Sequence, residues 1–175
     1  MAKKKREGWQ NRIIGEGEQP ASQFTANPNN WRKHPQAQRD AMKGALTEIG
    51  WVQRVIVNKR TGYLVDGHER VWEALQNGDQ PVPYVEVDLS EQEEAYVLAT
   101  LDPLAAMADA DGVQLRALLD EVQSEDAAVQ AMLAKLGADT GAVVPDFQPV
   151  GADEQGRLDQ KKPITCPECG HEFQA

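Results

Sequence analysis

The segment from Tyr63 to Gly78 constrains the fold more than any other part of this sequence. Its pattern predicts a short strand over Tyr63–Asp66, a single glycine at Gly67, and a helix from there to about Asn77. A helix that starts directly after a strand leaves the N–H groups of its first turn unpaired, at the positive end of the helix dipole. The segment therefore predicts an α/β fold with an anion-binding turn.

Five consecutive residues in this turn can supply phosphate chemistry. Gly67 lets an anion approach the backbone, and Arg70 can donate a forked pair of hydrogen bonds to a phosphate. His68 is a candidate acid–base group. Asp66 and Glu69 are candidate ligands for Mg²⁺ or Mn²⁺, which would activate water or neutralise phosphate. The predicted catalytic residues are therefore His68, Glu69 and Asp66.

The same residues also fit an ordinary strand–helix junction. In that interpretation Asp66 caps the helix, His68 and Glu69 are solvated, and Arg70 pairs with Glu69 or Glu73. The spacing alone favours this simpler interpretation, because short motifs often occur without function.

The flanking segments alternate between helical and strand patterns. Ser90 and Glu93 form a capping box at the start of one of the helices, and Gly50 ends another. The expected helices are Gln36–Ile49, Ser90 to about Leu101, Val113–Val122 and Asp126–Leu136, and the expected strands are Val52–Asn58, which forms a hairpin with Tyr63–Asp66, and Val82–Leu89. The class is mixed α/β with a C-terminal helical extension.

The charge is distributed unevenly along the 175 residues, whose net charge is -10. Residues 1–78 contain 13 basic and 8 acidic residues, whereas residues 79–160 contain 3 basic and 18 acidic residues. Any phosphate-binding surface is therefore expected in the first half. The acidic second half is expected to keep the protein soluble or to bind a basic partner.

Membrane insertion and secretion are not expected. The sequence has no apolar run of about 18 residues, and no apolar segment follows the basic start Met1–Arg6. The two cysteines, Cys166 and Cys169, are too close in sequence to staple a fold and read as a reduced pair. The expected location is the cytoplasm.

The Cys166-Pro-Glu-Cys169 segment resembles one knuckle of a zinc ribbon. A structural zinc site takes four ligands, and only Cys166, Cys169 and His171 are local. A second chain or a further segment would have to complete the site. The alternative is an unfinished knuckle that binds no metal.

Four ordered segments together resemble the ParB-like N-terminal domain family, also called the ParB-like nuclease domain, of the ParB/sulfiredoxin superfamily. These segments are Asn27–His34, Gly50–Gln53 with the strand Val55–Asn58, the signature Val65–Arg70, and Ala99–Pro103. The last of them resembles bacterial and phage members that stand beside DNA methyltransferases.

The resemblance implies a small mixed sheet with packed helices and a ligand that carries phosphate, either DNA or a nucleotide. It adds Gln53 to the predicted phosphate- or nucleotide-binding residues Gly67, His68 and Arg70. The implied organisation is a basic flexible tail over 1–14, the ParB-like domain over 15–103, an acidic helical extension over 104–137, a linker over 138–163 and the knuckle-like tail over 164–175.

The relatives differ in activity. Partition-type members bind CTP and Mg²⁺ with Gly-x-Arg-Arg, but Glu69 replaces the first arginine here, and their Glu-Asn pair is absent near Ala99. Both departures argue against CTP clamping. Sulfiredoxins need a cysteine where this chain has His68, so their chemistry is rejected. Other members are described as nucleases or nucleotide-dependent kinases, and the sequence does not separate the two.

Two functions of different classes follow. The first is binding of DNA or a nucleotide, with metal-dependent cleavage, hydrolysis or phosphoryl transfer as its enzymatic form. The second is a non-catalytic adaptor that recruits a DNA methyltransferase or another DNA-processing partner through its acidic helices.

The two helices after residue 112 have the outline of a helix–turn–helix, but their acidic residues favour a packing or dimerisation hairpin, and hence a homodimer, over DNA reading. Trp31, Trp51 and Trp72 are expected in the core rather than on a base-stacking platform, because none lies on an aromatic-rich strand.

Overall fold

The computed structural model describes residues 8–142, 164–165, 169 and 172–173. The chain divides into two compact units, Met1–Val143 and Val144–Ala175. Within the second unit, β5 (Ile164–Thr165) pairs antiparallel with β6 (Glu172–Phe173). The predicted site lies in the first unit.

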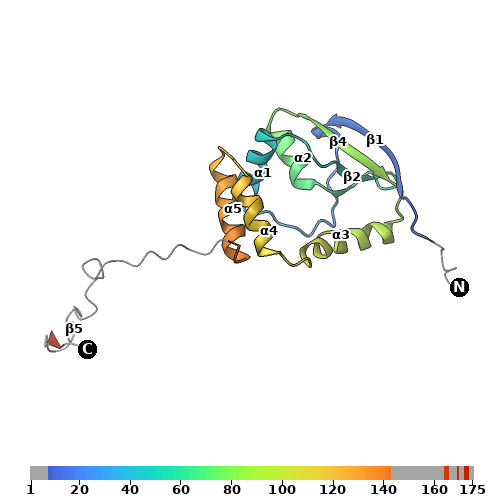
Figure 1. Ribbon diagram of the computed structural model, residues 1–175. Coiled ribbons are helices and arrows are strands. Elements are labelled where there is room, and N and C mark those ends of the chain that lie inside the picture. The colour runs from blue at the N-terminus through green and yellow to red at the C-terminus, as the bar shows by residue number, and fades with distance from the viewer. Residues whose placement is uncertain (1–7, 143–163, 166–168, 170–171, 174–175) are drawn as a thin grey trace. The chain divides into compact units, whose positions relative to one another are not determined.

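A four-stranded mixed sheet forms the centre of the first unit (Figure 1). Its strands lie in the order β1-β4-β2-β3. The two central strands, β2 and β4, are parallel, whereas β1 pairs with β4 and β3 with β2 in the antiparallel direction. The bounds are Ile13–Pro20 for β1, Val55–Asn58 for β2, Leu64–Asp66 for β3 and Pro81–Val87 for β4. The predicted hairpin of β2 and β3 is confirmed.

Five α-helices and one short 3₁₀ helix accompany the sheet among the described residues. They are η1 (Ala21–Gln23), α1 (Gln36–Glu48), α2 (His68–Gln76), α3 (Glu91–Ala106), α4 (Gly112–Glu121) and α5 (Ala127–Asp139). In Figure 1, α3 runs below the sheet, and α4 and α5 lie together beside α1. The mixed α/β class predicted from the sequence is confirmed, and none of the described helices is long and apolar enough to cross a membrane.

The core lies where α2 packs on the sheet. Val55 of β2 and Val82 of β4 are completely buried, and Val71 and Ala74 of α2 cover them. Burying such β-branched side chains stabilises the fold by about 1.5 to 3 kcal/mol each. The apolar face of α2 therefore fixes the helix, and with it the turn before the helix, against the sheet.

The strand β1 is not predicted from the sequence, which places residues 13–14 in a basic tail and assigns no helix or strand to residues 15–20. Its sequence Ile-Ile-Gly-Glu-Gly-Glu-Gln-Pro has weak β-propensity. Pairing with β4 along its length overrides that local preference. Arg12 anchors the start of β1 by donating hydrogen bonds to the Asp88 carbonyl and the Glu93 carboxylate, and this contact holds the pKa of Glu93 well below its ordinary value.

The helix α3 begins as predicted but ends later. The capping box of Ser90 and Glu93 is present at its start. The helix continues through Pro103 to Ala106, past the predicted end at Leu101 and past residues 103–104, where the sequence places the start of the helical extension. A proline inside a helix removes one backbone hydrogen bond, and tertiary contacts of α3 outweigh that loss.

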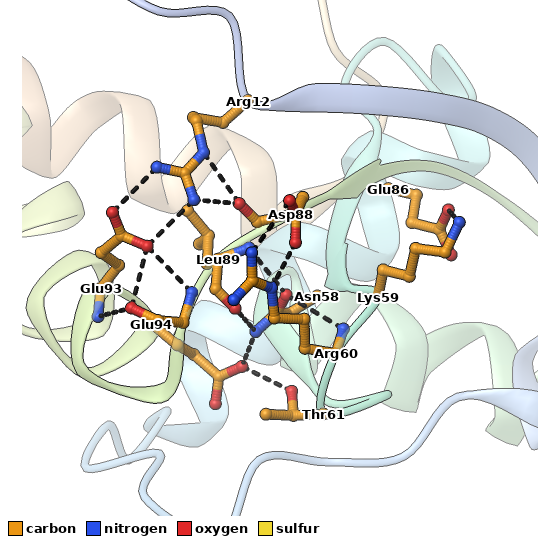
Figure 2. Close-up of polar contacts among 11 residues, drawn as sticks. Arg12, Asn58, Lys59, Arg60, Thr61, Glu86, Asp88, Leu89, Glu93 and Glu94 are labelled. Carbon is orange, nitrogen blue, oxygen red and sulfur yellow. Dashed lines mark hydrogen bonds and ion pairs between the residues drawn. The ribbon is translucent and has the colours of Figure 1, made fainter.

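The buried carboxylate of Glu94 ties the start of α3 to the sheet (Figure 2). It accepts hydrogen bonds from the amide groups of Asn58, at 2.6 Å, and Asn27, at 2.8 Å, and from the Thr61 hydroxyl. Asn58 is itself fully buried and also bonds both the carbonyl and the amide of Leu89. This Glu94 network joins three segments of the chain, at residue 27, residues 58–61 and residues 89–94.

A second carboxylate, Glu48 at the end of α1, holds the α4–α5 hairpin. It accepts hydrogen bonds from the Ser124 hydroxyl and from the amides of Glu125 and Asp126, and these bonds lower its pKa. Gly44 permits the close approach, because a Cβ there would collide with the Asp126 carboxylate.

We expect Glu94→Ala to lower the free energy of unfolding by roughly 3 kcal/mol, because it leaves several buried donors without an acceptor. Urea unfolding measures the change. Glu91→Ala is the matched control, since Glu91 lies exposed in the same helical turn, and its loss should stay below about 1 kcal/mol. Equal losses for the two variants would show that the Glu94 network contributes nothing.

Candidate functional site

The turn between β3 and α2 depends on Gly67. Its backbone adopts a φ of +89°, in the left-handed region that side chains disfavour. A Cβ at this position would collide with the buried side chain of Val55 and lie 3.3 Å from Arg70 Nη2. Glycine is therefore required both by the backbone conformation and by the close packing of the turn on the core.

The start of α2 has no side-chain cap among the described residues. The alternative that Asp66 caps the helix is therefore wrong. The first backbone hydrogen bond across the turn runs from the Val71 amide to the Gly67 carbonyl. Gly67 and the first three residues of α2 line a cavity, so the amides of the first turn are placed to meet an anion.

Arg70 pairs with Asp66 rather than with Glu69 or Glu73. Its Nη2 lies 2.7 Å from Asp66 Oδ2, one helical turn earlier, and the two side chains are 14% and 18% exposed. The ion pair uses one edge of the guanidinium. It holds the Arg70 guanidinium beside the turn and reduces the net positive charge available to a bound anion.

Glu69 is buried and faces α1. Its Oε1 lies 2.9 Å from Arg39 Nε, but the N–H group is not aimed at the oxygen, so both atoms lack a hydrogen bond within the described structure. The Arg39 guanidinium also lies over the Trp72 ring, 4.7 Å from its centroid. Glu69 therefore balances the charge of an arginine that links α1 to α2.

His68 accepts a hydrogen bond. The backbone N–H of Asn27 donates to His68 Nε2 at 3.1 Å. The ring proton of the neutral form therefore resides on Nδ1. Burial lowers the pKa of His68 below its ordinary 6.5; the nearby Asp66 opposes this shift and His34 adds to it. The neutral ring of His68 therefore has an Nδ1–H group that can donate a hydrogen bond to a ligand, whereas Nε2 is occupied by the Asn27 backbone N–H.

A cavity of about 490 Å³, called here the Arg70 cavity, brings the predicted residues together. Gln53, Asp66, Gly67, His68, Glu69 and Arg70 all line it. Its remaining walls come from α1, α3, the loop before α1 and the strands β2 and β3. They are Asn30, Arg32, His34, Gln38, Met42, Ile56, Val65, Val97, Leu98, Leu101, Asp102 and Ala105. The sequence predicted the residues of the turn and Gln53 as site residues. It did not predict most of the other residues that line the cavity.

The loop over residues 27–35, which the sequence marks as a segment of the family resemblance, supplies further polar residues to the cavity. Arg32 forms an ion pair with Asp102 of α3, and the Trp31 indole donates to the Leu98 carbonyl at 3.1 Å. His34 lies 3.1 Å from Gln38. The Asn-Pro-Asn-Asn cluster marks this loop in the sequence, but no pattern links it to α3.

Positive and negative charges are matched in this region. Each guanidinium, from Arg32, Arg39 or Arg70, has its own carboxylate partner. Within the described residues, no group of three or more His, Cys, Asp or Glu side chains is arranged to hold a metal ion. A divalent cation at Asp66 would therefore need oxygens from its ligand as well.

The other predicted sites give mixed outcomes. Cys169 is exposed and unbonded to another cysteine, whereas Cys166 and His171 lie outside the described residues, so the zinc site stays a prediction. Trp51 packs against the core as expected. The core assignment is wrong for Trp31 and Trp72, which are 58% and 40% exposed, because each lies under an arginine at the surface.

Comparison with known proteins supports the fold. No protein-family model matches the sequence, and no curated protein matches it. The structure is similar to that of the C-terminally truncated chromosome-partitioning protein ParB from Caulobacter crescentus complexed with CTP-γ-S, with a TM-score of 0.50 and 18% sequence identity over 61% of this chain and 62% of that chain.

Two structures of a pNOB8-like ParB N-domain are also similar. Their TM-scores are 0.46 and 0.45 and their identities 15% and 14%, over 95% of this chain and 59% and 56% of those chains. This chain thus spans about three fifths of the chains that it resembles. The ParB-like fold predicted from the sequence is confirmed.

We expect Gly67→Ala to lower the free energy of unfolding by about 3 kcal/mol, from backbone strain plus the collision with Val55. Gly62→Ala is the control, because Gly62 also has a positive φ, of +71°, but open space around it; its loss should be about 1 kcal/mol. Urea unfolding of both variants isolates the collision. Equal losses would contradict the close packing of the turn.

The depressed pKa of His68 makes stability depend on pH. Below about pH 6.5 the unfolded chain takes up a proton that the folded ring resists, so the free energy of unfolding falls as the pH is lowered from 7 toward 5. We expect His68→Gln, which keeps an acceptor for the Asn27 amide, to flatten this dependence. Urea unfolding across the pH range measures it, and an unchanged slope in the variant would show that His68 is not responsible.

Proposed function

We propose that the domain binds a phosphate-bearing ligand, a nucleotide or DNA, in the Arg70 cavity. The observation that carries the proposal is the uncapped start of α2, which meets the guanidinium of Arg70 and the side chain of Gln53 in one cavity. Backbone amides at a helix start and a guanidinium are the groups that proteins use for phosphate. The similar ParB structure contains CTP-γ-S, which supports a nucleotide as the first ligand to test.

In this proposal the phosphate lies against the amides after Gly67, and Arg70 turns one edge of its guanidinium to it. Because Asp66 already neutralises Arg70, binding is strongest for a ligand that brings a cation. Asp66 would hold Mg²⁺ or Mn²⁺, and the ion would neutralise charge on the phosphate. The proposal therefore includes divalent-metal dependence.

An enzymatic form of the proposal adds chemistry to binding. Asp66 and Glu69 would hold the metal ion, and His68 would transfer a proton during DNA cleavage, nucleotide hydrolysis or phosphoryl transfer. The contacts of Glu69 with Arg39 and of His68 Nε2 with Asn27 favour binding over this form. Assays for the three reactions with Mg²⁺ or Mn²⁺ decide between the two.

The adaptor function has an observation of its own. The helices α4 and α5 expose apolar side chains, with Val113 at 82%, Leu118 at 57% and Met132 at 47%. Such a surface among acidic residues suits a protein partner. The resemblance to members beside DNA methyltransferases makes that enzyme class the partner to test, and the same surface would serve a homodimer.

We expect Arg70→Ala to weaken nucleotide or DNA binding roughly 10- to 100-fold, the usual value of a charge-assisted hydrogen bond. Titration calorimetry of the full chain with nucleoside triphosphates and with DNA, with Mg²⁺ and with a chelator, measures it. Arg54→Ala is the matched control, because Arg54 pairs with Glu16 away from the cavity.

Asp66→Asn tests the metal arm of the same experiment. Without Mg²⁺ the variant should bind the nucleotide or DNA more tightly than the parent does, because Arg70 loses its competing carboxylate. Adding Mg²⁺ should not increase the affinity of the variant. The double variant Asp66→Asn/Arg70→Ala controls for the carboxylate left unpaired by Arg70→Ala. If the parent binds no nucleotide and no DNA under any condition, the proposed function is wrong. The adaptor function is then the favoured hypothesis.

A further inference from the structure

A second cavity adjoins the Arg70 cavity on the far side of His68. It has a volume of about 600 Å³ and is called here the Trp72 cavity, with Phe24, Lys33, Arg39, Trp72 and Leu75 among its walls. The two cavities share Asn30, Arg32, His34, His68 and Glu69 as walls. The two cavities therefore lie next to each other, with these shared residues between them.

Aromatic and apolar groups line one side of the Trp72 cavity. Trp72 is 40% exposed and Leu75, one turn later in α2, is 42% exposed. The Arg39 guanidinium covers part of the Trp72 ring and is anchored beside Glu69. The Arg39 contact holds the Trp72 ring in place and leaves part of this aromatic side chain exposed, which is what stacking of a planar ring requires.

The charge of the Trp72 cavity differs from that of the protein as a whole. Arg32, Lys33 and Arg39 line it against one carboxylate, that of Glu69, whereas the chain carries a net charge of -10. Arg32 and Arg39 have carboxylate partners, but Lys33 forms no ion pair with any residue that the structure describes. A local excess of positive charge favours a polyanion over an apolar or basic peptide.

We infer that the Trp72 cavity holds a base of single-stranded DNA whose phosphate lies in the Arg70 cavity. The inference rests on the proposed function and names its ligand more closely. Stacking on an aromatic ring, with cations along the backbone, is how proteins bind single strands without reading their sequence. A duplex is not expected to fit, because its bases are stacked on one another and hide their faces.

Two groups have separate tasks in this arrangement. Trp72 stacks on the base, and its effect should not depend on salt. Lys33 meets the backbone phosphate next to that base, and its effect should depend on salt, because each neutralised phosphate of a single strand releases counterions. Substituting each residue therefore tests a different part of the inference.

The experiment uses the full chain and a fluorescein-labelled oligo(dT) of about 10 nucleotides, within the range of single-strand sites. Fluorescence anisotropy gives its affinity, with a blunt duplex of the same length as a second probe and a mononucleotide as a competitor. We expect the single strand to bind more tightly than the duplex.

Trp72→Leu should weaken oligo(dT) binding about tenfold or more, the usual effect of losing one stacked base. Trp72→Phe should retain most of the affinity because it keeps an aromatic face. Trp9→Leu removes another exposed tryptophan, which lines neither cavity, and should change nothing. Lys33→Gln should reduce the slope of log affinity against log salt by about 0.7. Circular dichroism confirms that each variant is folded.

The outcomes separate this inference from the proposed function. Unchanged oligo(dT) affinity in Trp72→Leu, or equal affinity for the duplex, overturns the inference. If Arg70→Ala still weakens mononucleotide binding in that case, the proposed function stands alone.

Discussion

Asn27 connects the candidate site to the scaffold that supports it. Its amide side chain donates to the buried carboxylate of Glu94, and its backbone N–H donates to His68 Nε2. Glu94 in turn holds Asn58 of β2 and the turn residue Thr61. A single chain of hydrogen bonds therefore runs from the sheet through the start of α3 to the first residue of α2. Because Asn27, Asn58 and Glu94 are buried, each bond lost among them leaves a polar atom without a partner, which makes the arrangement hard to deform locally.

The charges of the site are balanced before any ligand binds. Three arginines each have a carboxylate partner, and these pairs join α2 to its own turn, α1 to α2, and the 27–35 loop to α3. Paired charges hold these side chains in place, and the desolvation of the charges offsets much of their attraction. They also mean that an anion must share an arginine with an acid or bring a cation. Beyond His68 the balance changes, because Lys33 is present without a partner among the described residues.

Local signals predicted some elements well. The capping box placed the start of α3, Gly50 placed the end of α1, and the strand–glycine–helix pattern placed β3 and α2 within a residue. Each depends on contacts between residues that are close in sequence. The strand β1 and the last turn of α3 were not predicted, because β1 is stabilised by pairing with β4 and α3 by its contacts with distant segments. Propensity carries no information about such partners.

The sequence by itself determined the chemistry of the Asp66–Arg70 turn, because a glycine with positive φ, a helix start and an arginine one turn later are all local features. The tertiary structure decided what each group of that turn does. It directed Asp66 to Arg70, Glu69 to Arg39 and the Nε2 of His68 to Asn27, and it left Trp72 at the surface beside a basic cavity. The partners Arg39 and Asn27 come from segments more than 25 residues away along the chain, so only folding brings them together. The free energy of each contact depends on that meeting and on the burial that accompanies it.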